Sequence, residues 1–154
     1  MQQGIRVRVG AVIVRNSAIV LVEYDDDKSG RHFNLPGGGV NEGESLHDAL
    51  QREILEETCM QVDVGRLLLV WEYVPSHHAE KYGSRHVIAL LFHCEPHAGS
   101  EPRLPEVPDE NQIDARWVRL EDLPYVPLLP QIGERLLTTL HAARQEDIFC
   151  QGLL

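Results

Sequence analysis

The stretch LPGGGVNEGESLHDALQREILEE, Leu35–Glu57, determines how the whole chain is interpreted. Its second half predicts an α-helix that begins after Ser45, because a serine hydroxyl accepts hydrogen bonds from the amides of a first helical turn. Asp48 occupies the capping-box position and supports the same start. On a helical wheel with about 100° per residue, Leu50 falls about 40° from Leu46, and the two define an apolar stripe that faces the core.

Three glutamates lie on or beside that stripe. With Leu46 at zero, Glu53 falls at about 340°, Glu57 at about 20° and Glu56 at about 280°. A buried carboxylate without a partner is costly, and neighbouring carboxylates raise one another's pKa values. Arg52 alone cannot neutralise all three. A Mg²⁺ or Mn²⁺ ion can, because both prefer oxygen ligands. The alternative is an ordinary solvated face where the stripe reaches water.

Three glycines, Gly37–Gly39, precede this helix and are predicted to form a loop after a short strand. Glycine permits positive φ and close backbone approach, so such a loop can present amides to an anion. A tight strand-to-helix turn explains the glycines equally well. The combined pattern is more specific, because five residues separate Gly38 from Glu44 and seven separate Glu44 from Arg52.

This pattern resembles the Nudix box, G-x5-E-x7-R-E-U-x-E-E-x-G-U, in which U is a bulky aliphatic residue. The matching positions are Gly38, Glu44, Arg52, Glu53, Ile54, Glu56, Glu57 and Met60. The resemblance implies a single Nudix domain over residues 1–154, with an α/β/α sandwich fold and a mixed β-sheet. Cys59 stands where the box has its second glycine, which normally ends the helix in a left-handed conformation. That conformation costs cysteine about 1 kcal/mol, so Cys59 either adopts it or the helix ends differently.

The resemblance also implies a hydrolase that uses Mg²⁺ or Mn²⁺ to cleave the diphosphate of a nucleoside diphosphate linked to another group. By position, Glu53, Glu56 and Glu57 are expected to hold the metal. Arg52 is expected to orient a glutamate through a charge-assisted hydrogen bond. All the box carboxylates are present, which favours an enzyme over a Nudix module that binds nucleotides without hydrolysing them.

Supporting roles follow from the same resemblance. Gly37 and Gly38 are expected to shape the strand-to-helix turn, and Glu44 to support the loop or a further metal. The general base is a box glutamate or an acid on a later loop, where the candidates are Glu101, Glu106, Asp109 and Glu110. Glu110 is the favoured hypothesis, although any of these acids is explained equally by solvated surface.

The substrate is predicted to be ADP-ribose or a nucleotide sugar. Pro75 lies sixteen positions beyond Cys59, a spacing that resembles ADP-ribose-cleaving Nudix enzymes. Trp71 and Tyr73 are candidates for stacking on a base, although a strand with that pattern usually packs them in the core. A nucleoside triphosphate or a dinucleoside polyphosphate remains an alternative.

Composition sets further bounds. The chain has 154 residues, 14 basic and 24 acidic side chains, and a net charge of -10, which argues against a general affinity for nucleic-acid phosphates. Its three cysteines, Cys59, Cys94 and Cys150, are too few and scattered for a disulfide framework, so a reducing cytoplasmic location is expected. No apolar run reaches the length of a membrane span. Homodimers are common in the Nudix family, and the sequence does not decide this point.

The remaining elements are predicted from apolar runs and turn residues. Asn16 and Ser17 are expected to turn a hairpin. Gly65 marks a bulge or turn inside a strand region. The predicted segments are a hairpin within 5–24, a charged loop at 25–32, a short strand at 33–35, strands at 62–74, 85–95 and 115–120, an exposed loop at 96–108, a turn-rich connector at 121–130 and a helix at 131–145.

Overall fold

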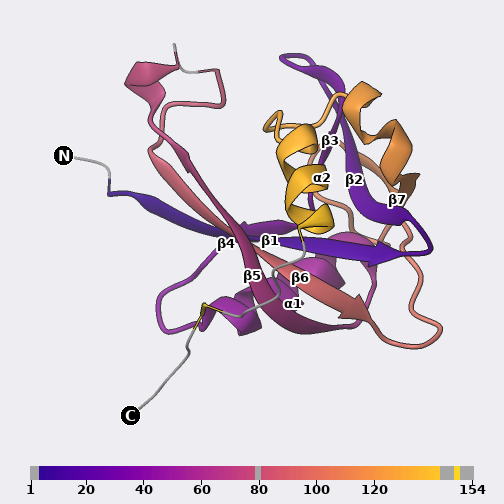
Figure 1. The fold of residues 1–154 in the computed structure, drawn as a ribbon. Helices are drawn as coiled ribbons and strands as arrows, with labels where there is room; N and C mark the ends of the chain where they lie inside the picture. The colour runs from indigo at the N-terminus through magenta and orange to yellow at the C-terminus, as the bar shows by residue number, and fades with distance from the viewer. Residues whose placement is uncertain (1–3, 79–80, 143–147, 150–154) are drawn as a thin grey trace.

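The computed structural model describes residues 4–78, 81–142 and 148–149 (Figure 1). Its helices and strands, in chain order, are β1 (Arg6–Arg15), β2 (Ala18–Asp26), β3 (Gly30–Asn34), β4 (Gly37–Gly39), α1 (Leu46–Thr58), β5 (Val62–Tyr73), β6 (Val87–Pro96), β7 (Gln112–Arg119) and α2 (Gly133–His141). Two 3₁₀ turns, Pro75–His77 and Leu120–Tyr125, follow β5 and β7. Among these residues, no helix is both long and apolar enough to cross a membrane.

Strand β1 connects the parts of the sheet. Its sequence RVRVGAVIVR is rich in valine and isoleucine, which favour extended backbone. β1 runs parallel to β6, with Arg6 opposite Val87 and Ile13 opposite Cys94, and antiparallel to β2 and β4. The strand order is β3-β2-β1-β6-β5, with β4 on β1 and β7 on β2. Parallel and antiparallel pairs therefore share one sheet, which confirms the predicted mixed sheet.

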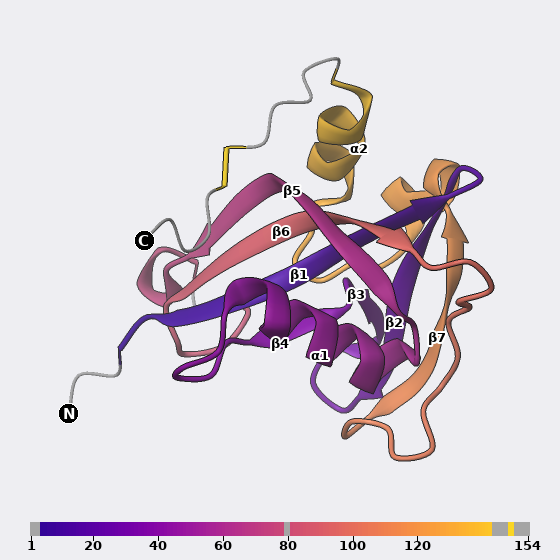
Figure 2. The same cartoon turned by 90° about the horizontal axis from the view of Figure 1, so that it is seen from below.

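The two helices cover opposite faces of the sheet (Figures 1 and 2). One core cluster contains Leu50 and Ile54 of α1 together with Phe92 of β6. The other cluster contains Leu136 of α2 together with Leu91 of β6. Because Leu91 and Phe92 are neighbours on one strand, their side chains point to opposite faces. Each helix therefore buries its apolar stripe on its own side, as the predicted sandwich requires.

Two sequence predictions about turns are confirmed. Asn16 and Ser17 join β1 to β2, and both have positive φ, at 50° and 59°. Gly65 lies where the pairing of β5 with β6 shifts register. A Cβ at this glycine would lie 3.0 Å from the carbonyl oxygen of His93. Gly65 therefore allows the close strand approach that the bulge requires.

The predicted charged loop at 25–32 is largely wrong. β2 continues through Asp26, and β3 already begins at Gly30. The Asp26 carboxylate accepts the backbone amides of Lys28 at 2.9 Å and Ser29 at 2.6 Å. These bonds close a tight turn, so strand pairing extends over most of the segment.

The prediction of a glycine loop at Gly37–Gly39 is also corrected. The three glycines form β4 and pair antiparallel with β1, with Gly39 opposite Arg8 and Gly37 opposite Gly10. β1 offers a free edge at this position, and an extended backbone satisfies its own polar groups by pairing there. The glycine segment is therefore held in place before α1 begins.

Helix α1 begins and ends as its sequence indicates. Ser45 is the N-cap, and its hydroxyl accepts the amide of Asp48 at 3.0 Å. Cys59 is the C-cap and adopts the left-handed conformation, with φ of 58°. Its amide donates to the carbonyl of Leu55 at 3.0 Å. Cysteine thus takes the conformation of the box glycine that it replaces.

The C-terminal segment differs in its bounds. α2 spans Gly133–His141, whereas residues 143–145 of the predicted helix lie outside the described residues. The predicted connector contains a 3₁₀ turn, Leu120–Tyr125. Cys59 and Cys94 are free thiols, and Cys150 also lies outside the described residues.

Candidate active site

Glu57 is a carboxylate enclosed between α1, β2 and β4. Its side chain is 5% exposed. The amide of Gly37 donates to its Oε2 at 2.7 Å, and the hydroxyl of Tyr24 donates to its Oε1 at 3.0 Å. Burial raises the pKa of Glu57 to about 8, and the charges of Glu53 and Asp109 act in the same direction against the two hydrogen bonds.

Glu53 lies against the next glycine of β4. A Cβ at Gly38 would overlap the Glu53 carboxyl group, so only glycine leaves room for it. The Glu53 side chain is 14% exposed, and its Oε1 accepts Nη1 of Arg52 at 2.7 Å. Consecutive glycines therefore hold the carboxylates of Glu53 and Glu57 side by side.

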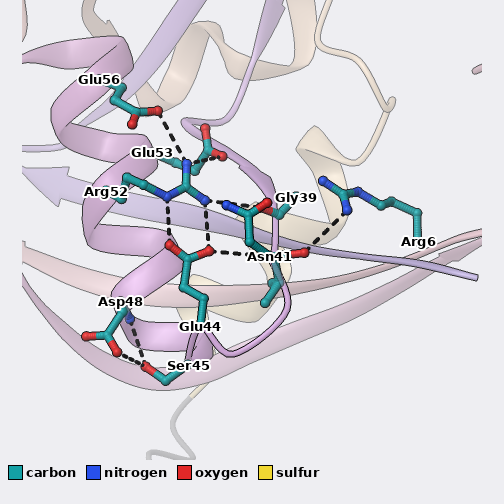
Figure 3. A network of polar contacts seen from close by, with 10 residues as sticks. Arg6, Gly39, Asn41, Glu44, Ser45, Asp48, Arg52, Glu53 and Glu56 are labelled. Atoms are coloured by element: carbon teal, nitrogen blue, oxygen red, sulfur yellow. Dashed lines mark hydrogen bonds and ion pairs between the residues drawn. The ribbon is translucent and has the colours of Figure 1, made fainter.

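Arg52 is the centre of a polar network between α1 and the segment that precedes it (Figure 3). Its Nε and Nη2 donate to the two oxygens of Glu44 at 2.7 Å and 3.0 Å. Its Nη2 also reaches the carbonyl of Gly39 at 3.2 Å. The guanidinium therefore contacts both Glu44 and Glu53, and its role in orienting a glutamate stays a prediction.

Glu44 supports the loop before α1, one of its two expected roles. Its Oε2 accepts the amide of Asn41 at 3.1 Å. Hydrogen bonds from Arg52 hold the pKa of Glu44 down at about 2, so this carboxylate stays charged. Gly37 and Gly38 do more than shape a turn, because the first donates to Glu57 and the second makes room for Glu53.

The expectation that Glu56 is buried with the others is wrong. Its side chain is 56% exposed, and it reaches back to Nη1 of Arg52 at 3.3 Å. Its wheel position, about 80° from Leu46, places it at the margin of the stripe, where the helix meets water. Its assignment as a metal ligand stays a prediction.

The loop before β7 is fastened to the end of α1 by Gln112, which is 6% exposed. Its amide Nε2 donates to the carbonyl of Glu57 at 2.7 Å, and its Oε1 accepts the amide of Asp109 at 3.2 Å. The charge of Asp109 raises the pKa of both Glu57 and Tyr24. Among the candidate loop acids, Asp109 is thus one whose charge raises the pKa of the Glu57 carboxyl group.

The other loop acids differ in their surroundings. Glu101 accepts Nε1 of Trp117 at 2.7 Å and pairs with Arg15, which lowers its pKa. These partners give Glu101 a structural role. Glu110 is exposed on the same loop as Asp109, and its assignment as the general base stays a prediction.

The carboxylate oxygens of Glu53 and Glu57 provide part of a site for a divalent cation. Within the described residues, no three His, Cys, Asp or Glu side chains converge as a ready-made metal site. In the described ion pairs of α1, Arg52 is the basic partner of Glu44, Glu53 and Glu56. None of these ion pairs involves Glu57. Glu57 is thus a buried oxygen donor without a basic partner, next to Glu53. Oxygen donors of this kind are those that Mg²⁺ and Mn²⁺ bind.

A cavity of about 380 Å³ opens next to Gly37. Its lining includes three basic residues, Arg8, Lys28 and Lys81, and, in the described part of the chain, no acidic one. In a protein with a net charge of -10, such a cavity favours an anionic ligand. Sequence reasoning missed these basic residues, because they come from a strand, a turn and a loop that share no local pattern.

Aromatic rings line the same cavity. Tyr73 is 1% exposed, and it stacks on Trp71 at 5.9 Å and on His78 at 5.6 Å. Tyr82 meets both Trp71 and Tyr73 edge-on, at 5.8 Å and 5.5 Å. Tyr73 is therefore a core ring, as its strand position indicated. Among the described rings, only Tyr73 stacks face to face on Trp71.

The chain matches the model of the NUDIX domain family over residues 4–140. It therefore belongs to the Nudix family. A NUDIX hydrolase from Nitrosomonas europaea has a TM-score of 0.76 at 20% identity, with 94% of each chain covered. A MutT NUDIX hydrolase from Burkholderia pseudomallei has a TM-score of 0.70 at 29% identity, with 86% of this chain and 98% of that chain covered. Both likenesses confirm the expected fold class.

Relatives of known name are similar over much of this chain. The NAD-capped RNA hydrolase NudC of Pseudomonas putida (strain W619) is 33% identical over 137 residues, 89% of this chain and 44% of that protein. The nucleoside triphosphatase NudI of Escherichia coli O139:H28 is 30% identical over 135 residues, 80% of this chain and 88% of that protein. The matched region spans less than half the length of the NudC relatives.

Removal of the ionisable group of Glu57 is expected to stabilise the metal-free protein at neutral pH, because this group is ionised in the unfolded chain and burial in the folded protein raises its pKa to about 8. Glu57→Gln keeps the side-chain volume and an oxygen that accepts from Gly37, while it removes a carboxylate that burial disfavours. We expect the thermal unfolding midpoint in EDTA to rise by roughly 2–4 °C, on the order of 1 kcal/mol. Glu56→Gln, the same change at an exposed site, is the control and should leave the midpoint unchanged. A lower midpoint for Glu57→Gln would contradict the prediction.

Proposed function

We propose that this protein hydrolyses the diphosphate of a nucleoside diphosphate linked to another group, in a reaction that requires Mg²⁺ or Mn²⁺. ADP-ribose or a nucleotide sugar is the first substrate choice. The observation that carries the proposal is the position of the cavity. Its basic and aromatic lining adjoins Gly37, whose amide holds the buried Glu57 carboxylate. A nucleotide in the cavity would therefore place its diphosphate near the acids of α1.

The helix acids and the diphosphate repel one another unless a cation lies between them. Bound there, Mg²⁺ or Mn²⁺ would supply charge neutralisation and would activate water. Glu53 and Glu57 would hold the ion, and Glu56 is proposed as a third ligand. Arg52 would keep Glu53 oriented through its hydrogen bond to Oε1. Arg8, Lys28 and Lys81 would attract the substrate's phosphates.

The names of two relatives bear on the substrate. NudC is named for hydrolysis of NAD-capped RNA, and NAD is itself a diphosphate that joins two nucleosides. This supports a linked nucleoside diphosphate. NudI is named a nucleoside triphosphatase, and its match covers 88% of that protein. A nucleoside triphosphate is therefore the second candidate, and the cytoplasmic location and a homodimer stay predictions.

A panel of nucleotides tests the reaction directly. ADP-ribose, a nucleotide sugar, NAD, a nucleoside triphosphate and a dinucleoside polyphosphate are incubated with Mg²⁺ or Mn²⁺, and release of AMP or phosphate is measured. We expect the fastest turnover with ADP-ribose or the nucleotide sugar. Glu57→Gln should abolish turnover and remain folded, because it removes the buried ligand charge. Metal-dependent turnover retained by Glu57→Gln would count against the site, and preference for the triphosphate would establish the second candidate.

We propose that the general base comes from the loop at 109–110. The closeness of Asp109 to Glu57 supports Asp109, while the sequence prediction favours Glu110. Asp109→Asn and Glu110→Gln form a matched pair, since each removes one charge. Because a base acts in the transition state, its loss should lower kcat by on the order of 100-fold with little change in KM. If neither variant lowers kcat in this way, the base does not lie on this loop.

Trp71 is proposed to stack on the substrate's base with the ring face that Tyr73 does not cover. Trp71→Leu removes the aromatic face, and stacking on one base contributes roughly 1–3 kcal/mol. We therefore expect KM to rise by about tenfold or more with kcat nearly retained. Trp71→Phe, which keeps an aromatic face, should recover most of the affinity. A loss confined to kcat in Trp71→Leu would argue against a base contact.

A further inference from the structure

Tyr24 contacts Glu57 from outside the Nudix box. It lies on β2, and its hydroxyl donates to Oε1 of Glu57 at 3.0 Å. The amide of Gly37, on β4, donates to Oε2 of the same carboxylate at 2.7 Å. Two strands therefore fix the two oxygens of one buried acid that belongs to a helix.

We propose that Tyr24 is a positioning residue that sets the orientation of Glu57 for a divalent cation. The inference rests on the proposed function, because it takes Glu57 as a metal ligand. Tyr24 would act through Glu57 and would touch neither the cation nor the substrate.

Hydrogen-bond geometry explains why a phenol suits this position. Each carboxylate oxygen has about two lone-pair positions, so Tyr24 and Gly37 leave acceptor capacity on both oxygens. One donor on each oxygen prevents rotation of the carboxylate plane. Hydrogen bonds to the ligands of a metal orient them, and their loss typically weakens metal binding 10–100-fold.

The sheet holds the Tyr24 ring in turn. Tyr24 is the cross-strand partner of His32 on β3, and the two rings stack at 5.7 Å with an interplanar angle of 15°. His32 is 7% exposed, and its Nδ1 lies 2.8 Å from the carbonyl oxygen of Gly30. Tyr24 therefore has little freedom to turn its hydroxyl away from Glu57.

A register shift brings a second contact to the same glutamate. β2 and β7 pair Glu23 with Asp114, and then Tyr24 with Gln112, so that Ile113 is passed over. Gln112 donates to the carbonyl oxygen of Glu57 at 2.7 Å. The cross-strand pair Tyr24 and Gln112 thus holds both the side chain and the main chain of Glu57. Such a bulge re-aims side chains toward a site.

Metal binding without nucleotide tests the inference. Tyr24→Phe removes only the hydroxyl and keeps the ring that stacks on His32. Mn²⁺ is titrated into the nucleotide-free protein, and free Mn²⁺ is followed by electron paramagnetic resonance. We expect the affinity of Tyr24→Phe for Mn²⁺ to fall by about tenfold or more. The Mn²⁺ concentration for half-maximal turnover should rise by the same factor, with kcat largely recovered at saturating Mn²⁺.

Tyr73→Phe is the matched control. It removes another buried phenol hydroxyl, which donates to the carbonyl of Gly83 and accepts the amide of Tyr82, away from Glu57. This variant should bind Mn²⁺ as the wild type does. Thermal unfolding in EDTA measures stability for both variants. A purely structural Tyr24 would lower the midpoint and leave Mn²⁺ affinity unchanged, and that result would overturn the proposal.

The metal-binding experiment distinguishes failure of the proposed metal site from failure of the proposed role of Tyr24. If the wild-type protein binds no Mn²⁺, the metal site itself is refuted, and the role of Tyr24 with it. If the wild type binds Mn²⁺ and Tyr24→Phe binds it equally well, only the positioning role is refuted.

Discussion

The candidate site depends on the enclosure of one carboxyl group, that of Glu57, in a place where no described basic side chain neutralises it. The apolar stripe of α1 must pack on β1 and β6, and Glu57 lies within that stripe, so burial of the stripe carries the acid inward. A backbone amide from β4 and a phenol from β2 then stabilise its oxygens. These donors lessen the cost of burial, and the raised pKa of about 8 shows that they do not remove it.

Arg52 divides the acids of the box into two groups. Its guanidinium contacts Glu44, Glu53 and Glu56. Glu57, one turn further along, lies beyond this network. Arg52 thus offsets part of the charge of three acids, while none of the described ion pairs of α1 involves the buried Glu57. A protein that only had to be stable would gain by a residue without an ionisable group at this position, so the buried carboxyl group is consistent with the proposed cation site.

Local patterns predicted helix α1, its N-cap and most of the strands, because periodicity and capping act over a few neighbouring residues, but they did not predict β4. The structure confirms Ser45 as the N-cap and Gly65 as the bulge. The helical wheel led to a wrong expectation for the burial of Glu56, because an angle around the helix does not give the depth of a side chain below the surface. Tyr24 was not foreseen, because it meets Glu57 across 33 residues of sequence through a strand pairing that no local pattern specifies. The register shift beside Tyr24 is equally a property of the assembled sheet.

Gly37–Gly39 show that the sequence motif alone does not specify which neighbours the residues of the site contact. Each of the three excludes a Cβ for a different neighbour: Gly37 for the carbonyl of Val9, Gly38 for the carboxyl of Glu53, and Gly39 for the guanidinium of Arg6. The strand formed by these glycines thus lies against the carboxyl groups of Glu53 and Glu57, and the basic cavity begins at Gly37. A cation at the acids and an anionic ligand in the cavity would each meet an oppositely charged surface, and this complementarity would allow a protein with a net charge of -10 to accept the proposed phosphorylated substrate.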